Sequence, residues 1–258
     1  MNPDYLRAKR QLCEATGNRN RFALTGGHGY IVFSTQSADS PVTVQATAGR
    51  RLPPGVRLSP ADAGCLGDRG LRQQRASQDF RSQFDRGDDD AWTKWLTAAP
   101  ALLTTVYGAT EAEIEVRTCF EKIVDLDNQS LVEAMNHLAK VRTWSARTGL
   151  YMSLVRAQLV CALADEATAS TDHAPLYEAG QIGDFPSFAL FTDYAALDNF
   201  KPIGLRAKVV KGMDIFPRIL ANRVGSVLIN PHGQPRGELY NNEIGIIVDG
   251  IKRLKGIH

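Results

Sequence analysis

Residues 187–200, SFALFTDYAALDNF, contain the pattern that decides the fold class. The apolar run at 188–191 is typical of a short buried strand, and a helix-like segment capped by Thr192 or Asp193 follows directly. The same alternation continues, with further strand-like and helix-like runs at 205–210, 214–222, 226–229 and 242–255. Strands that alternate with helices predict an α/β or α+β domain built around a small sheet.

Two amphipathic helices are predicted ahead of this region. Ser130 and Glu133 have the spacing of a capping box, which marks the start of the first helix. The second helix is predicted to begin at Ser145, and its apolar stripe consists of Leu150, Leu154, Ala157 and Cys161. The small polar residues at 165–171 predict a loop after it.

The N-terminal part of the chain is predicted to form a separate unit. β-branched and aromatic residues fill three strand-like runs, which lie at 21–25, 30–35 and 42–47. Ser59-Pro60 predicts a helix start, because serine can cap the first turn and proline already has the φ angle of a helix. Downstream we expect a polar loop, a long helix that Pro100 kinks or divides, and a shorter helix, at 73–90, 91–107 and 111–120 respectively.

Composition excludes several classes of protein. The chain has 258 residues, of which 43% are apolar, and 30 basic residues against 28 acidic ones give a net charge of +2. This balance is that of a folded globular protein and gives no electrostatic reason to expect a nucleic-acid partner. No apolar run approaches the roughly 18 residues of a membrane helix, and the N-terminus lacks the apolar stretch of a secretory signal. We therefore expect a soluble, cytoplasmic protein without membrane insertion.

The sequence contains no local signature of an enzyme. The glycine-rich turn at 26–29 lies between two predicted strands, so it predicts a hairpin and not a phosphate-binding loop. The GxxxxGK[ST], GxSxG and HExxH motifs are missing, and the cysteines and histidines are dispersed without metal-ligand spacing. The acidic run at 88–90 predicts a helix start. No catalytic residue, metal or cofactor is expected, although an enzyme with dispersed active-site residues stays open as an alternative.

Two places are candidate partner-binding sites. The loop at 230–235 follows a predicted strand, and its proline-bounded sequence can display Asn230 and His232 at a sheet edge. The alternative is a tight turn in which Asn230 bonds its own backbone. Trp92 and Trp95 share a helix face with apolar neighbours, so they belong either to the core or, if partly exposed, to an anchor for a partner chain.

The C-terminal half resembles the SseB N-terminal domain family. The segments that carry the resemblance are, in order, NQSLVEAMNHLAKV, ARTGLYMSLVRAQLV, SFALFTDYAALDNFKP, LRAKVVKGMDIFPRILAN and GSVLINPHG, between 128 and 233. The matching positions are Phe191, Thr192, Leu197, Phe200, Gly212, Leu220, Val227, Asn230, Pro231 and Gly233. The family is associated with bacterial secretion systems and supplies no catalytic residues to transfer. The resemblance implies a mixed sheet with helices.

The N-terminal half resembles the TY-Chap domains, which are related to YbjN and to type III secretion chaperones. The segment LPPGVRLSPADAGCLGDRGLR at 52–72 carries this resemblance, with Leu52, Pro53, Pro54, Arg57, Leu58, Leu66, Gly70 and Leu71 as the matching positions. The tryptophan that usually follows in this family is replaced here by Leu71-Arg72. The resemblance implies binding of peptides from secreted effectors or toxins.

Together these patterns predict an α+β protein of two small domains. Residues 1–120 are expected to form a TY-Chap-like antiparallel sheet with helices, and residues 121–258 an SseB-like mixed sheet with helices. The function implied is a non-enzymatic, secretion-associated chaperone or adaptor that binds a segment of an effector or toxin and that can form a homodimer. The alternative is a small-molecule-responsive regulatory protein or an enzyme.

Overall fold

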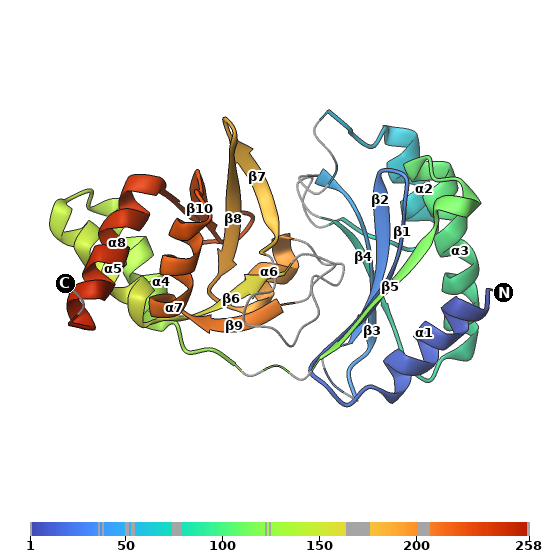
Figure 1. Ribbon diagram of the computed structural model, residues 1–258. Helices are drawn as coiled ribbons and strands as arrows, with labels where there is room; N and C mark the ends of the chain where they lie inside the picture. Colours follow the sequence, from blue (N-terminus) through green and yellow to red (C-terminus); the bar gives the residue numbers. More distant parts are fainter. Residues whose placement is uncertain are drawn as a thin grey trace. The chain divides into compact units, whose positions relative to one another are not determined.

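The computed structural model describes residues 2–35, 37, 39–49, 52, 55–73, 79–121, 123, 125–163, 176–200 and 207–256. The chain forms two compact units, and the N-terminal unit ends at Ile123 (Figure 1). The sequence had placed this boundary after residue 120, which lies inside the last strand of the N-terminal unit. Both units combine helices with a sheet, so the predicted α+β class is confirmed.

The N-terminal unit contains a five-stranded antiparallel sheet. Its strands are β1 (Arg19–Gly26), β2 (Gly29–Thr35), β3 (Val42–Ala46), β4 (Phe80–Phe84) and β5 (Glu115–Glu121), in the order β4-β3-β2-β1-β5. Gly26 pairs with Gly29 across a two-residue turn, which confirms the predicted hairpin. Gly27 has a φ of +56° and therefore adopts a conformation that few other residues tolerate.

Two strands of this sheet were predicted incorrectly. β4 falls within the segment 73–90, which was expected to be a loop, and β5 replaces the helix expected at 111–120. Only a single 3-10 turn, η2 (Glu111–Glu113), precedes β5. β5 pairs with β1 over seven residues, so a partner strand distant in sequence supplies the hydrogen bonds that local propensity could not reveal.

Three helices cover one face of this sheet: α1 (Pro3–Glu14), α2 (Pro60–Asp68) and α3 (Asp89–Tyr107) (Figure 1). The Ser59 cap of α2 is confirmed, because Ser59 Oγ accepts a hydrogen bond from the Asp62 amide at 3.1 Å. α3 continues through Pro100 without division, contrary to one of the two outcomes expected there. The core between sheet and helices contains stacked rings of Phe22, Phe33 and Trp92, with the two phenylalanine centroids 4.6 Å apart.

The C-terminal unit contains a six-stranded mixed sheet, as predicted. Its strands are β6 (Gln158–Ala162), β7 (Glu178–Ile182), β8 (Phe185–Phe191), β9 (Ala207–Lys211), β10 (Ser226–Ile229) and β11 (Gly237–Tyr240). Their order is β11-β10-β8-β6-β9, with β7 paired to β8. β10 is parallel to β8, and the other pairings are antiparallel.

Helices cover both faces of this sheet (Figure 1). The helices are α4 (Gln129–Lys140), α5 (Trp144–Arg156), α6 (Tyr194–Phe200), α7 (Gly212–Ala221) and α8 (Asn241–Leu254). Along β8, Leu190 joins the core under α4, α5, α7 and α8, whereas the neighbouring Phe191 joins the core under α6. Both faces of the strand are therefore apolar, which explains its continuous apolar run. Among the residues that the structure describes, no helix is long and apolar enough to cross a membrane.

Three predictions about this unit were wrong, and one cannot be compared. α5 ends at Arg156, so Cys161 belongs to strand β6 and not to a helical stripe. The cap residue of α4 is Asn128 and not Ser130, and the side-chain Nδ2 of Asn128 donates to the carbonyl oxygens of Gln158 and Thr192. Strands β7 and β11 were not predicted. The loop expected at 165–171 lies outside the described residues, as do Pro53 and Pro54.

We expect Trp92→Ala to destabilise the N-terminal unit by about 3–5 kcal/mol, because it removes a fully buried ring from the stack and leaves a cavity. The indole Nε1 also donates to the Arg86 carbonyl at 2.9 Å, and that hydrogen bond is lost. Urea unfolding measures the change. Lys94→Ala on the exposed face of α3 is the control and should shift stability by less than about 0.5 kcal/mol. Equal midpoints for the two variants would contradict this account.

Gly212 and Gly245 provide a matched pair in the C-terminal unit. A Cβ at Gly212 would lie 1.8 Å from the Leu154 carbonyl oxygen, whereas at Gly245, inside α8, it would meet nothing within 4 Å. We expect Gly212→Ala to destabilise the unit by about 1–3 kcal/mol or more. Gly245→Ala should stabilise it by about 0.5–1 kcal/mol, since alanine favours the helix. Thermal unfolding of both variants checks the two signs, and the same sign for both would be inconsistent with the close approach at Gly212.

Candidate partner-binding site

The structure places Trp92 and Trp95 in the core of the N-terminal unit. Trp92 is 0% exposed and Trp95 is 4% exposed. Trp92 stacks on Phe22 and Phe33 and meets Phe84 edge-on. The interpretation of these two residues as partner-binding is therefore corrected, because neither ring is accessible to another chain.

Asn230 is also a structural residue. It is 1% exposed, has a φ of +48° and follows strand β10. Its side-chain oxygen accepts from the Thr192 amide at 3.0 Å, and its side-chain nitrogen donates to Thr192 Oγ1 at 3.0 Å and to the Pro235 carbonyl at 3.1 Å. Asn230 thus fastens the loop at 230–235 to the end of β8. The prediction that Asn230 contacts a partner is wrong, since its amide is consumed inside the fold.

His232, from the same loop, remains at the surface. Its ring lies 5.1 Å from the ring of Phe200 at an interplanar angle of 57°. The structure therefore does not bring together the four residues that were expected to contact a partner: Trp92 and Trp95 are buried in the N-terminal core, Asn230 is buried in the C-terminal unit, and His232 is exposed.

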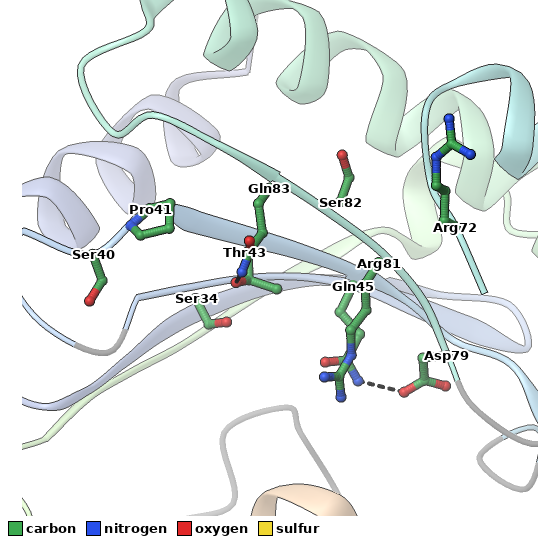
Figure 2. Close-up of a pocket in the computed structure, with 10 residues that line it drawn as sticks. All are labelled: Ser34, Ser40, Pro41, Thr43, Gln45, Arg72, Asp79, Arg81, Ser82 and Gln83. Atoms are coloured by element: carbon green, nitrogen blue, oxygen red, sulfur yellow. Dashed lines mark hydrogen bonds between the residues drawn. The ribbon is translucent and has the colours of Figure 1, made fainter. Parts of the chain in front are cut away.

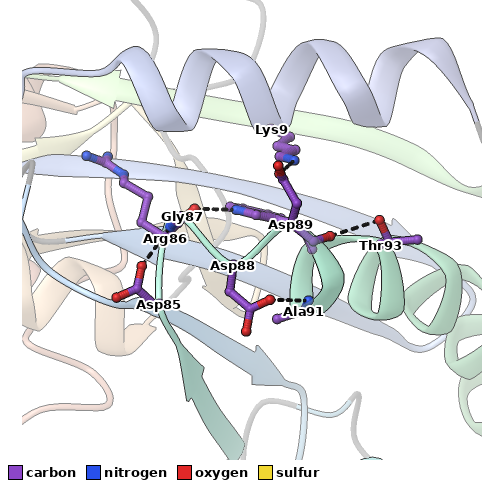
Figure 3. A network of polar contacts seen from close by, with 9 residues as sticks. Lys9, Asp85, Arg86, Gly87, Asp88, Asp89, Ala91 and Thr93 are labelled. Atoms are coloured by element: carbon purple, nitrogen blue, oxygen red, sulfur yellow. Dashed lines mark hydrogen bonds and ion pairs between the residues drawn. The ribbon is translucent and has the colours of Figure 1, made fainter.

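The acidic run at the start of α3 has a structural role (Figure 3). Asp88 Oδ1 accepts from the Ala91 amide at 2.9 Å and caps the helix, and Asp89 Oδ1 accepts from Lys9 Nζ at 2.7 Å. Asp85 closes a short turn by accepting from the Gly87 amide at 2.8 Å. The predicted helix start is confirmed. Within the described ranges, no group of three histidine, cysteine or acidic residues could hold a metal ion.

A polar hollow of about 570 Å³ lies on the sheet of the N-terminal unit (Figure 2). Ser34, Thr43, Gln45 and Arg81 line it and alternate along their strands with residues of the core. Asp79 is already committed, because its carboxylate accepts from Gln45 Nε2 and, at 2.8 Å, from the Ala48 amide. The hollow therefore offers hydroxyl, amide and guanidinium groups to a polar ligand.

An apolar groove of about 310 Å³ lies between α5 and α8 in the C-terminal unit. We name it the α5–α8 groove; its walls include Trp144, Tyr151, Met152, Val155, Ile246, Ile247 and Leu254, and its rim includes Asp249 and Arg253. Trp144 is 65% exposed, Leu254 60% and Ile246 43%. Large apolar side chains gathered in one concave surface are typical of a site that another protein covers.

A second cleft, of about 400 Å³, lies on the other side of α5. We name it the arginine cleft, because Arg142, Arg147 and Arg236 line it. Its apolar wall comes from α4, α5 and strands β10 and β11, through Met135, Leu138, Leu150, Leu154, Ile229 and Leu239. Glu238, Tyr240 and Glu243 complete the lining.

Glu243 connects α5 to α8 between the groove and the cleft. Its Oε1 accepts from Tyr151 Oη at 2.8 Å and from Arg147 Nη1 at 3.1 Å, and its Oε2 accepts from the Tyr240 amide at 3.1 Å. Burial and the neighbouring Glu243 carboxylate raise the pKa of Tyr151 to about 12. The tyrosine therefore stays protonated and continues to donate to Glu243 over the physiological pH range.

Sequence reasoning missed the groove, although a signal for it exists. Trp144, Thr148 and Met152 follow helical spacing and form a second stripe on α5, beside the core-facing surface that contains Leu150, Tyr151, Leu154 and Val155. On α8, Ile246, Gly250 and Leu254 lie outside the core stripe in the same way. A helix with more apolar surface than one sheet can cover is the signal that could have marked this site.

No protein-family model, no curated protein and no solved structure matches the chain. The geometry of the surfaces described above is therefore the basis for a proposed function.

Proposed function

We propose that this protein is a non-enzymatic adaptor or chaperone that binds a segment of a partner protein in its C-terminal unit. The single observation that carries this proposal is the α5–α8 groove. Trp144 projects from it with 65% of its surface exposed, next to the exposed Ile246 and Leu254. Exposed tryptophan in a concave apolar surface is costly in water and is typical of an energetic anchor at a protein interface.

The resemblances to SseB-like and TY-Chap domains support a more specific form of the proposal. In that form the partner is a secreted effector or toxin, the protein acts in the bacterial cytoplasm, and a second copy of the chain can take part in a homodimer. An apolar groove between two helices suits a segment that presents one apolar face, and such segments are a common mode of peptide recognition.

A pull-down from the native host tests this proposal. We expect Trp144→Ala to weaken capture of the partner about thirtyfold, because truncation of a central interface tryptophan costs about 2 kcal/mol or more. Since Trp92 and Trp95 are buried, a blue shift of the chain's tryptophan fluorescence upon binding would report Trp144 directly. Leu6→Asp, at an apolar residue of the N-terminal unit that is 45% exposed, is the control and should leave capture unchanged. Capture of no secreted or toxin-like protein by the wild type, or equal capture by both variants, would refute the proposal.

A second candidate function, the sensing of a small polar ligand, is favoured by the hollow in the N-terminal unit. Its serine, threonine, glutamine and arginine side chains suit an amino acid or a nucleotide better than an apolar peptide. In a thermal-shift screen of these compounds, a ligand at 100 times its dissociation constant should stabilise the protein by about 2.7 kcal/mol. Arg81→Ala should abolish that shift, whereas Arg10→Ala, at an exposed site on α1, should not. Absence of any shift would remove this candidate.

A further inference from the structure

The arginine cleft carries more positive charge than its own carboxylates neutralise. Glu243 is occupied by Arg147, Tyr151 and the Tyr240 amide. Glu238 accepts from Tyr240 Oη at 3.3 Å. Arg142 and Arg236 are exposed, and across the described residues neither takes part in an ion pair or a side-chain hydrogen bond.

The surface on the far side of α5 has the same sign. Arg253 lies on the rim of the α5–α8 groove, and the nearby Asp249 pairs with Lys252 at 3.6 Å. Arginines that form no ion pair within the described part of the chain therefore lie beside both apolar surfaces. Such groups match carboxylates well, because a guanidinium can donate two parallel hydrogen bonds to one carboxylate.

The arginine cleft also reaches the last strand in the order of the described sheet. β11 is the end strand of the sheet, with β10 as its neighbour. All four residues of this strand, Gly237, Glu238, Leu239 and Tyr240, line the cleft. A strand edge of this kind offers backbone donors and acceptors to an extended segment of another chain.

We propose that the arginine cleft binds an extended acidic segment of the partner protein. One apolar side chain of that segment lies against Leu138, Leu150 and Leu239, and flanking carboxylates pair with Arg142 and Arg236. This inference rests on the proposed function and deepens it, because it names the chemistry of the partner: an apolar residue between acidic ones, continuous with the segment that fills the α5–α8 groove.

A polyanion without apolar groups would fit this cleft less well. The wall of methionine, leucine and isoleucine side chains would face phosphates that it cannot solvate, and Glu238 and Glu243 would repel them. An acidic peptide instead buries its apolar residue against that wall and places its charges at the rim. The combination of apolar wall and cationic rim therefore selects a peptide of mixed character.

Fluorescence anisotropy with defined peptides tests the inference on the full chain. The probe is a labelled peptide with a central leucine flanked on each side by aspartate and glutamate, compared with a peptide in which lysines replace the acidic residues and one in which serine replaces leucine. We expect the acidic leucine peptide to bind more tightly than both others. Its affinity should fall as salt is raised, since screening shortens the reach of charges from about 10 Å at 0.1 M to 3 Å at 1 M.

Matched double variants locate the binding. We expect Arg142→Gln with Arg236→Gln to raise the dissociation constant of the acidic leucine peptide about tenfold, because two charge-assisted contacts are lost. Arg10→Gln with Lys94→Gln removes the same net charge from exposed positions of the N-terminal unit and should change the affinity less than twofold. All four positions are exposed, so both variants should fold, and urea unfolding checks that they do.

Equal binding of the acidic and lysine peptides, or equal affinity in the two double variants, would overturn the inference. These results are distinguishable from failure of the proposed function. In one outcome, Trp144→Ala abolishes partner capture, whereas Arg142→Gln with Arg236→Gln leaves both peptide binding and capture intact. The groove then binds a partner, but the arginine cleft does not bind an acidic segment. If neither variant affects capture, the proposed function itself fails.

Discussion

The candidate site depends on the hydrogen bonds that the Glu243 carboxylate accepts. It sits at the start of α8 and accepts hydrogen bonds from Tyr151 and Arg147, both on α5. Because it also accepts from the Tyr240 amide, the first turn of α8 is held to α5 from the same point. The α5–α8 groove lies on one side of this contact and the arginine cleft on the other. One partly buried acidic group thus ties two helices together and lies between two adjoining surfaces.

Packing explains why those surfaces are exposed. The sheet of the C-terminal unit is covered on one face by α4, α5, α7 and α8, and each helix can turn only part of its circumference toward the sheet. Leu150 and Leu154 of α5 are buried there, as are Ile244 and Ile251 of α8. Trp144 is left outside the core. In an isolated domain such a stripe brings no stability, so its presence is the physical reason to look for a partner.

Local patterns predicted the elements whose determinants are local. Ser59-Pro60 predicted the start of α2, and the glycine-rich turn at 26–29 predicted the first hairpin. Both were correct because a few neighbouring residues determine a helix cap or a tight turn. β4 and β5 were missed because pairing with a strand distant in sequence decides them. β7 and β11 pair with the neighbouring strands β8 and β10, but each contains a glycine and a glutamate, which weaken the local strand pattern. The same limit applied to function. Trp92 and Asn230 are residue types that often occur in binding sites, but the structure shows that Trp92 belongs to a buried ring stack and that Asn230 holds a loop in place. Trp144 carried the better signal, which lay in a second helical stripe.

The hydroxyl of Tyr151 has a consequence for the conditions under which the surface persists. Its pKa is about 12 in the folded chain, above the roughly 10 of an unfolded tyrosine. A raised pKa means that the contribution of this group to stability is complete below pH 10 and disappears as the pH rises toward 12. Alkaline solution weakens many tyrosine hydrogen bonds near pH 10, but the α5–α8 junction keeps the contribution of Tyr151 at pH 9.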